Sequence, residues 1–259
     1  QEIVRDTSLP SATAFTLTGA NGGTGYINGS DSLTAKAVIT TAADTSGVKK
    51  ITFSADGTGF DSLATTEVSI NGAAPLSLIT SGVPTGDQFL LSGSTITLGT
   101  PITAASTITI NGITVTSTDG EKDVDIVLTD LAGNASSAID GDVYLDTTPP
   151  VLTLDGINSA TALLESGIYY SSAAAVIFDI TLADNIGSYN SGTKGYQVNS
   201  GSTVTGSTEV SLDALAAVTT YTLKAVDNAN NLSAGVPVKT MLHTTDPSAV
   251  ALVLKGNTS

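Results

Sequence analysis

The residues best suited to chemistry in this 259-residue chain are aspartates that recur at matched distances in its two halves. Asp44, in ADTSG, follows Asp6 by the same interval as Asp184, in ADNIG, follows Asp146, since 44 − 6 = 38 and 184 − 146 = 38. Carboxylates, with Asn and main-chain carbonyls, are the hard oxygen ligands that Ca²⁺ takes. If the fold gathers each set, the sequence predicts two cation sites.

A later pair of motifs belongs to the same pattern. DLAGN covers 130–134 and DNANN covers 227–231, and each begins 16 residues before the next proline-containing hinge, since 146 − 130 = 16 and 243 − 227 = 16. Gly133 then aligns with Asn230, two residue types that tolerate positive φ. The pair therefore predicts the same tight loop in each half.

The hinges themselves predict tandem repeats. RDTSLP begins at residue 5, LDTTPP at 145 and HTTDPS at 243, and each is followed by alternating apolar residues. Proline fixes φ and removes a donor, so a strand starts beyond each hinge and does not run through it. Recurrence of this unit predicts a lead-in at 1–5, one domain at 6–145, a second at 146–243, and the first strand of a further repeat, or an exchanged strand, at 244–259.

The first repeat is expected to carry an insertion. TEVSI at 66–70 matches TEVSL at 208–212, but the distance to the later aspartate is 60 residues in the first repeat (130 − 70) and 15 in the second (227 − 212). The difference predicts extra residues at about 71–117, in which STITLGTPI and STITING have the alternation of strands.

Composition favours sheets. Thr, Val, Ser and Gly are abundant, and no long stretch has helical periodicity, which predicts an all-β fold. In DVDIVLTD, alternation directs Val124, Ile126 and Leu128 inward and leaves Asp123 and Asp125 on the outer face, where we interpret them as solvated charge.

Charge and residue types exclude several functions. Nine basic residues against 24 acidic ones give a net charge of −15, a field that repels nucleic acid and anionic membranes. The chain has no cysteine and one histidine, His243, so thiol catalysis is excluded and a Ser-His-Asp triad would have to assemble across domains. No apolar run reaches membrane-spanning length. We therefore expect a protein that is not an enzyme.

The hinges, the ADxxG loop and the DxxGN loop, in this order, resemble bacterial Ig-like repeats of large cell-surface proteins, including adhesins and S-layer proteins. The resemblance implies tandem Ig-like β-sandwiches. The insertion at about 71–117 departs from the family pattern, and its strand-like segments predict that the first sandwich carries a β-rich insertion. The resemblance also implies an extracellular, structural role as an adhesin stalk or S-layer lattice, with neighbouring repeats or identical subunits as partners.

In an Ig-type sandwich the start of the first strand and the loops after the second and sixth strands lie at one pole. Applied to this sequence, that topology predicts two oxygen-rich poles where Ca²⁺ would stiffen the hinges; the alternative is that these residues only cap turns. The predicted ligands are Asp6, Asp44, Asp130 and Asn134 at one pole, and Asp146, Asp184, Asp227 and Asn231 at the other, with Asp119 and Glu121 directed towards the second.

Two further functions stay open. The apolar strand at 249–254 either begins another domain or enters the sheet of a neighbouring molecule and builds a fibre. The insertion at 71–117 is an alternative face for carbohydrate or protein.

Overall fold

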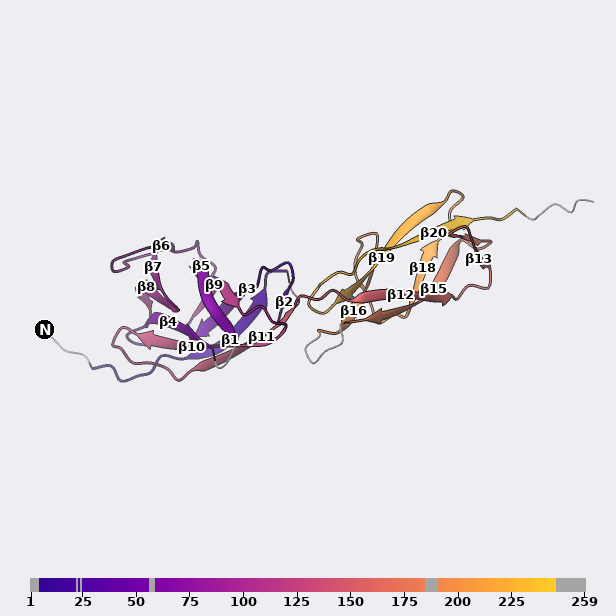
Figure 1. The fold of residues 1–259 in the computed structure, drawn as a ribbon. Helices are drawn as coiled ribbons and strands as arrows, with labels where there is room; N and C mark the ends of the chain where they lie inside the picture. The colour runs from indigo at the N-terminus through magenta and orange to yellow at the C-terminus, as the bar shows by residue number, and fades with distance from the viewer. Residues whose placement is uncertain (1–4, 22, 24, 56–58, 185–190, 246–259) are drawn as a thin grey trace, which may run out of the picture. The chain divides into compact units, whose positions relative to one another are not determined.

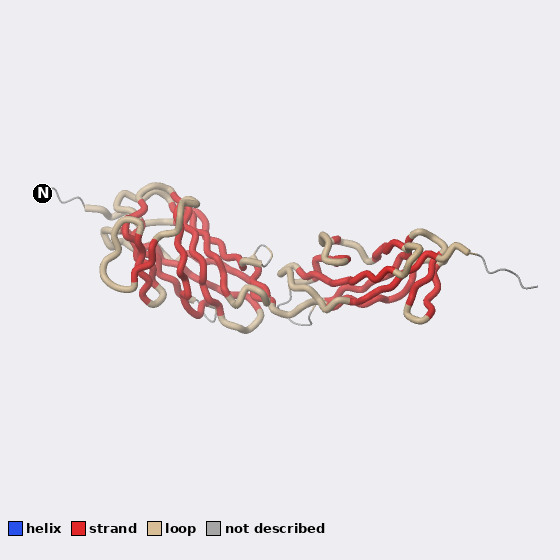
Figure 2. Tube along the Cα trace, turned by 90° about the horizontal axis from the view of Figure 1, so that it is seen from above, coloured by secondary structure: helices blue, strands red, loops and turns tan. Residues whose placement is uncertain are grey.

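The computed structural model describes residues 5–21, 23, 25–55, 59–184 and 191–245. These residues form strands and connecting loops without a helix, so the all-β class is confirmed for the described chain (Figure 2). Consequently the described chain holds no helix of the length and apolarity that crossing a membrane requires. The strand expected at 249–254 lies outside the described residues.

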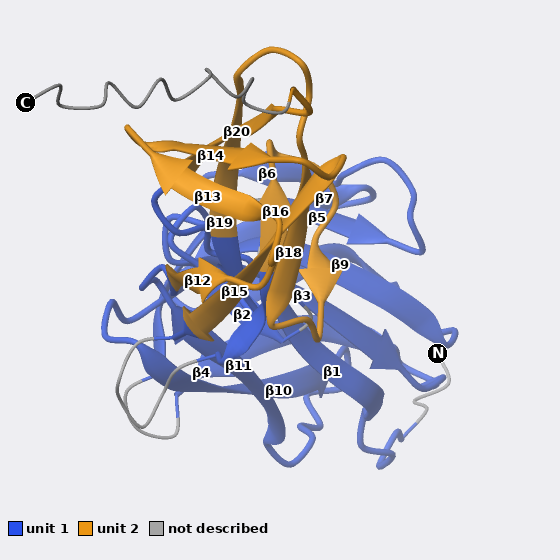
Figure 3. Ribbon diagram, turned by 90° about the vertical axis from the view of Figure 1, so that its right-hand side faces the viewer, with its two compact units in different colours: residues 1–151, 183–195, 225–234 blue, residues 152–182, 196–224, 235–259 orange. Residues whose placement is uncertain are grey.

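The chain divides into two compact units (Figure 3). Unit 1 comprises residues 1–151, 183–195 and 225–234, and unit 2 comprises residues 152–182, 196–224 and 235–259. Two loops from the second half of the sequence, at 183–195 and 225–234, thus belong to unit 1.

The first half of the chain forms two sheets (Figure 1). The four-stranded sheet has the order β1 (Ala12–Gly19), β3 (Thr34–Thr41), β9 (Ser106–Val115), β5 (Phe60–Ile70). The seven-stranded sheet has the order β2 (Tyr26–Asn28), β11 (Ile139–Asp146), β10 (Gly120–Asp130), β4 (Val48–Ser54), β8 (Thr95–Ile102), β7 (Gln88–Ser92), β6 (Ser77–Ile79).

These sheets enclose one apolar core, as expected for a β-sandwich. Alternate residues of β9 and β10 are buried, because successive side chains of a strand point to opposite faces. The predicted inward set, Val124, Ile126 and Leu128, is fully buried. Phe53, of β4, and Phe60, of β5, stack with ring centroids 6.1 Å apart and so join the two sheets.

The second half of the chain also forms two sheets. A three-stranded sheet has the order β12 (Val151–Ile157), β15 (Ala175–Ala183), β18 (Glu209–Asp213). A six-stranded sheet has the order β13 (Ala162–Glu165), β14 (Ile168–Ser171), β20 (Val236–Leu242), β19 (Thr219–Asp227), β16 (Thr193–Val198), β17 (Val204–Thr205). Tyr169 and Phe178 meet edge to face across these sheets at 4.7 Å.

The order of the strands in the two halves corrects the position in the sequence that we expected for the insertion. In the second half, β18 lies next to β15, whereas β9 holds the matching place next to β3 and β5 lies outside β9. The strand that matches β18 is therefore β9, inside the expected insertion at 71–117, and β5, which carries TEVSI, is an additional strand of the four-stranded sheet. The shared TEVS motif misled the alignment because alternation specifies which face of a strand is buried and does not specify its neighbours.

Candidate metal centres

Two groups of carboxylates expected from the sequence spacing are gathered in the structure. We call Asp6, Asp44, Asp130 and Asn134 corner 1, and Asp146, Asp184, Asp227 and Asn231 corner 2. In each corner the three aspartates offer carboxylate oxygens that all lie within 4.8 Å of one another. Both corners belong to unit 1.

The loop after β3 positions Asp44 of corner 1. Its Oδ1 accepts hydrogen bonds from the main-chain N–H groups of Ser46, at 3.1 Å, and Gly47, at 2.8 Å. Gly47 has φ 76°, and a Cβ there would lie 2.9 Å from the carbonyl carbon of Ile102. Only glycine adopts this turn without strain. Gly47, the last residue of ADTSG, therefore fixes the position of the Asp44 carboxylate.

The loop after β10 positions Asp130. Oδ1 of Asp130 accepts from the main-chain N–H of Asn134 and Oδ2 accepts from Nδ2 of Asn134, both at 2.8 Å. Burial alone would raise the pKa of Asp130, but the hydrogen bonds from Asn134, Ser46 and Gly133 outweigh it and lower the pKa. The loop therefore holds Asp130 as a carboxylate.

Asp6 completes corner 1 from the segment before β1. Its Oδ1 accepts from the main-chain N–H of Ser8 at 2.8 Å, and this hydrogen bond lowers the pKa of Asp6. Its Oδ2 is buried without a hydrogen-bond partner. A buried carboxylate oxygen without a donor is costly, which makes this atom suited to a cation.

Corner 2 repeats the bonds that Asp130 and Asp6 accept, whereas its third aspartate, Asp184, is held from a different segment than Asp44. Asp227 accepts from the main-chain N–H of Asn231 at 2.7 Å and from its Nδ2 at 2.9 Å. Asp184 accepts from the main-chain N–H of Gly192 at 2.6 Å. Asp146 accepts from the N–H groups of Thr148, at 3.1 Å, and Ser191, at 2.8 Å.

The loops that follow β10 and β19 also continue alike. Ser136 Oγ accepts from the N–H of Leu128 at 3.0 Å, and Ser233 Oγ accepts from the N–H of Ala225 at 2.8 Å. Asn231 makes one hydrogen bond that has no equivalent at Asn134 among the described residues. Its Oδ1 accepts from the N–H of Gly29 at 3.1 Å.

Corner 2 buries its charge more deeply than corner 1. Asp146 is 1% exposed and Asp227 is 0% exposed. Burial, followed by the negative charges of Asp146 and Asp184, raises the pKa of Asp227 to about 6, although hydrogen bonds from Asn231 oppose the shift. The hydrogen bonds to Asp146 and Asp227 in the described chain all come from neutral groups. A divalent cation would supply the missing positive charge.

The two other predicted ligands are not part of corner 2. Asp119 accepts from the N–H and hydroxyl of Thr147, at 3.2 and 2.9 Å, and from the hydroxyl of Thr148, at 3.1 Å. Glu121 accepts from the hydroxyl of Tyr144 at 2.9 Å. Asp119 thus braces the segment after Asp146, and Glu121 lies on the outer face of β10.

Sequence reasoning missed a third group. Asp123, Asp125 and Asp140 also bring carboxylate oxygens within 4.8 Å of one another. From the sequence alone, Asp123 and Asp125 are interpreted as solvated charge on a single strand. The signal that could have found the group is IDGD at 139–142, whose aspartates alternate like those of DVD at 123–125.

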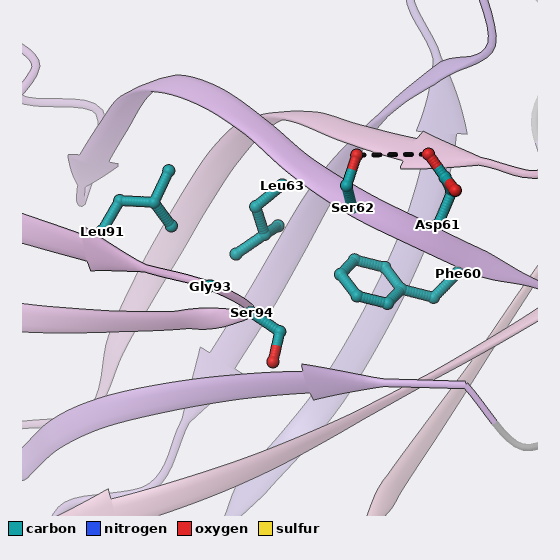
Figure 4. A pocket seen from close by; sticks show the side chains of 7 residues that line it. All are labelled: Phe60, Asp61, Ser62, Leu63, Leu91, Gly93 and Ser94. Carbon is teal, nitrogen blue, oxygen red and sulfur yellow. Dashed lines mark hydrogen bonds between the residues drawn. The ribbon is translucent and has the colours of Figure 1, made fainter.

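Unit 1 also contains a pocket beside β5 (Figure 4). Phe60 and Leu63 of β5 face Leu91 of β7 and Ser94 across a space of about 540 Å³. Asp61 and Ser62 form its polar part, where the hydroxyl of Ser62 donates to Asp61 at 3.2 Å.

No protein-family model matches the sequence, and a search of curated proteins found no match. Among solved structures, the chain is similar to fibronectin(III)-like modules of Clostridium thermocellum CbhA, with 14% identity, a TM-score of 0.43 and coverage of 92% of this chain and 100% of that chain. It is similar to the C-terminal domain of Streptococcus agalactiae BspA, with 12% identity, a TM-score of 0.35 and coverage of 89% and 100%. It is also similar to BcpA, the major pilin subunit of Bacillus cereus, with 12% identity, a TM-score of 0.32 and coverage of 90% and 69%.

Proposed function

We propose that this chain is a structural, non-enzymatic segment of an extracellular bacterial surface assembly, an adhesin stalk or S-layer lattice, built from tandem Ig-like repeats. Ca²⁺ binds at corners 1 and 2 and stiffens the chain at the start of each repeat. The partners are neighbouring repeats or identical subunits.

One observation carries this proposal: three aspartates and one asparagine at matched positions gather twice, and in both corners the asparagine side chain donates to the aspartate of its loop. Turn capping accounts for the bond from each N–H to a carboxylate. It does not account for three carboxylates that converge, because unscreened like charges at this distance repel. A cation between them turns the repulsion into coordination.

The donor atoms fit Ca²⁺ better than a softer metal. Each corner offers carboxylate oxygens from three aspartates and contains no cysteine or histidine. Ca²⁺ takes about six to eight oxygen ligands at about 2.3 to 2.6 Å, and main-chain carbonyls and water would complete the set. The residue types also favour a structural role, since the whole chain has one histidine and no cysteine.

The test is a thermal melt of the full chain in chelator, in millimolar Ca²⁺ and in millimolar Mg²⁺. Because a ligand that binds only the folded state stabilises it, Ca²⁺ is expected to raise the Tm, and Mg²⁺, which keeps several waters, is expected to raise it less. An identical Tm in chelator and in Ca²⁺ would exclude the cation joints.

A second function, recognition of carbohydrate or protein, is favoured by the pocket beside β5. Phe60, Leu63 and Leu91 provide an apolar wall next to the polar Asp61 and Ser62, a combination typical of small-ligand sites. A glycan array probed with the wild-type chain and with Leu91→Lys tests it: binding lost in the variant supports recognition, and equal signals exclude this pocket.

Fibre formation through 249–254 stays a prediction, and chromatography of a chain lacking residues 244–259 tests it.

A further inference from the structure

The loop after β19 is in contact with the connection between β1 and β3, and both segments belong to unit 1. Besides the bond from the N–H of Gly29, Nδ2 of Asn230 donates to the main-chain oxygen of Asn21 at 3.1 Å. A Cβ on Gly23 would collide with the main-chain oxygen of Asn228, so the two segments pack closely. The loop after β19 is therefore a docking surface for the segments before and after β2.

The matching loop after β10 has no equivalent contact among the described residues. Leu131, which matches Asn228 in the sequence, is 61% exposed. Ala132 is also exposed, whereas the matching Ala229 is buried. The segment before β1, which contributes to the same corner, contains Leu9, which is 62% exposed. We call this loop and this segment the corner 1 face.

Unit 2 carries a surface that corresponds to the segments docked in unit 1. β14 pairs in parallel with β20 as β2 pairs with β11, so the residues before and after β14 match the connection around β2. Main-chain hydrogen bonds join this region, since the N–H of Ser172 donates to Thr161 at 3.3 Å and that of Ala214 donates to Ala174 at 2.7 Å. The loops that form the surface, which we call the neutral face, lie at 158–161, 172–174 and 214–218.

The neutral face contains no charged residue. Leu215 is 52% exposed and Val218 is 47% exposed. Between them and around them, Ala160, Ala173 and Ala216 are also exposed. Small side chains let the main chain of a partner approach closely, and exposed aliphatic side chains that gather on one surface mark an interaction site.

Charge determines which of these faces can meet. Two corner 1 faces would oppose the carboxylates of Asp6, Asp44 and Asp130 from each copy, and like charges at short distance repel. A corner 1 face opposite a neutral face avoids this repulsion, because the three loops of the neutral face bring no carboxylate. The combination that charge permits also repeats the kind of contact that the loop after β19 makes within unit 1.

We propose that the corner 1 face of one copy of this chain binds the neutral face of a second copy, with Leu131 packed on the alanines around Leu215. Because the two faces differ, the contact is heterologous, and each copy can bind one copy through its corner 1 face and another through its neutral face. The inference rests on the proposed structural role, in which identical subunits are partners, and it names the surfaces through which they meet.

The test is sedimentation velocity of the full chain over a range of protein concentrations, in chelator and in millimolar Ca²⁺. The weight-average mass is expected to rise with concentration, as for a small and transient interface. Leu131→Gln and Leu215→Asp are each expected to weaken the association about tenfold or more, because each removes an apolar side chain from the contact. Both leucines are exposed, so each variant should keep the wild-type Tm.

An equimolar mixture of the two variants tests the heterologous geometry. Each variant keeps the face that the other has lost, so the mixture should form dimers at a concentration where each variant alone is monomeric. These dimers should not grow further, because both of their free faces carry a substitution. Val83→Asp is the matched control, since Val83 is 81% exposed in unit 1 outside the corner 1 face, and it should associate like the wild type.

Three results would overturn the inference. The first is a wild-type chain that stays monomeric at every concentration, and the second is a mixture of the folded variants that forms no dimers. The third is an association that neither substitution weakens, as strand exchange through 249–254 would give. A Tm that Ca²⁺ still raises would then leave the proposed cation sites standing without this contact.

Discussion

Asn231 donates from Nδ2 to the main-chain oxygen of Asp146 at 2.8 Å and so ties the loop after β19 to the hinge residue of its own corner. Asn134 makes the equivalent bond to the main-chain oxygen of Asp6 at 3.3 Å. In both corners the same amide also binds the aspartate of its loop. One asparagine therefore holds together parts of the chain that lie far apart in sequence.

Removing this amide should destabilise unit 1. Asn231→Ala leaves buried acceptors on Asp146 and Asp227 without a donor, which costs about 1–3 kcal/mol of the free energy of unfolding. Asn134→Ala should cost less, because Asn134 is less buried than Asn231 and makes the longer bond. Denaturant unfolding measures both; equal, negligible losses would show that the amides do not tie the corners.

In chelator, corner 2 should make the protein less stable as the pH rises. Because the pKa of Asp227 is raised to about 6 in the folded chain, its stabilising contribution is present in acid and is lost as the pH rises through that value. Asp184→Asn removes one of the charges responsible and should flatten the dependence of Tm on pH between 5 and 7.5. Asp61→Asn, an exposed control, should retain the wild-type slope, and a flat wild-type profile would contradict the burial argument.

Gly141 lies in the middle of β11, where close packing, and not a turn, requires glycine. A Cβ there would lie 2.5 Å from ring atoms of Phe15, which covers β11 from the four-stranded sheet. Gly141→Ala should therefore cost about 1–3 kcal/mol of stability by overpacking. Gly156→Ala is the matched control in β12, since no atom lies within 4 Å of its added Cβ. Equal unfolding midpoints for the two variants would show that Phe15 moves aside freely.

The sequence predicted the sheet faces better than the sheet neighbours. The period of two placed Val124, Ile126 and Leu128 inside because burial follows directly from alternation. The same period could not reveal that β9 lies between β3 and β5, since strand order depends on long-range pairing.

The candidate sites divide in the same way. Matched spacing indicated both corners, because their residues belong to loops that recur with the repeats. The group of Asp123, Asp125 and Asp140 depends on the register of β10 with β11, which no single-strand pattern contains. Lys122 is a further case: it is buried, its Nζ donates to Thr118 O and to Thr116 Oγ1, and burial lowers its pKa. These acceptors, together with the negative charge of Asp119, explain a lysine at an inward position.

Calorimetric titration of the desalted chain with Ca²⁺ tests the central claim, that the repeated corners are cation sites. We predict a stoichiometry of two per chain, one for each corner, falling to one in Asp44→Asn and to one in Asp184→Asn. Both substitutions keep an oxygen that can accept the loop N–H groups, so they remove charge with little change to the turns. No heat with an unchanged Tm at millimolar Ca²⁺, or full stoichiometry in both variants, would contradict the account.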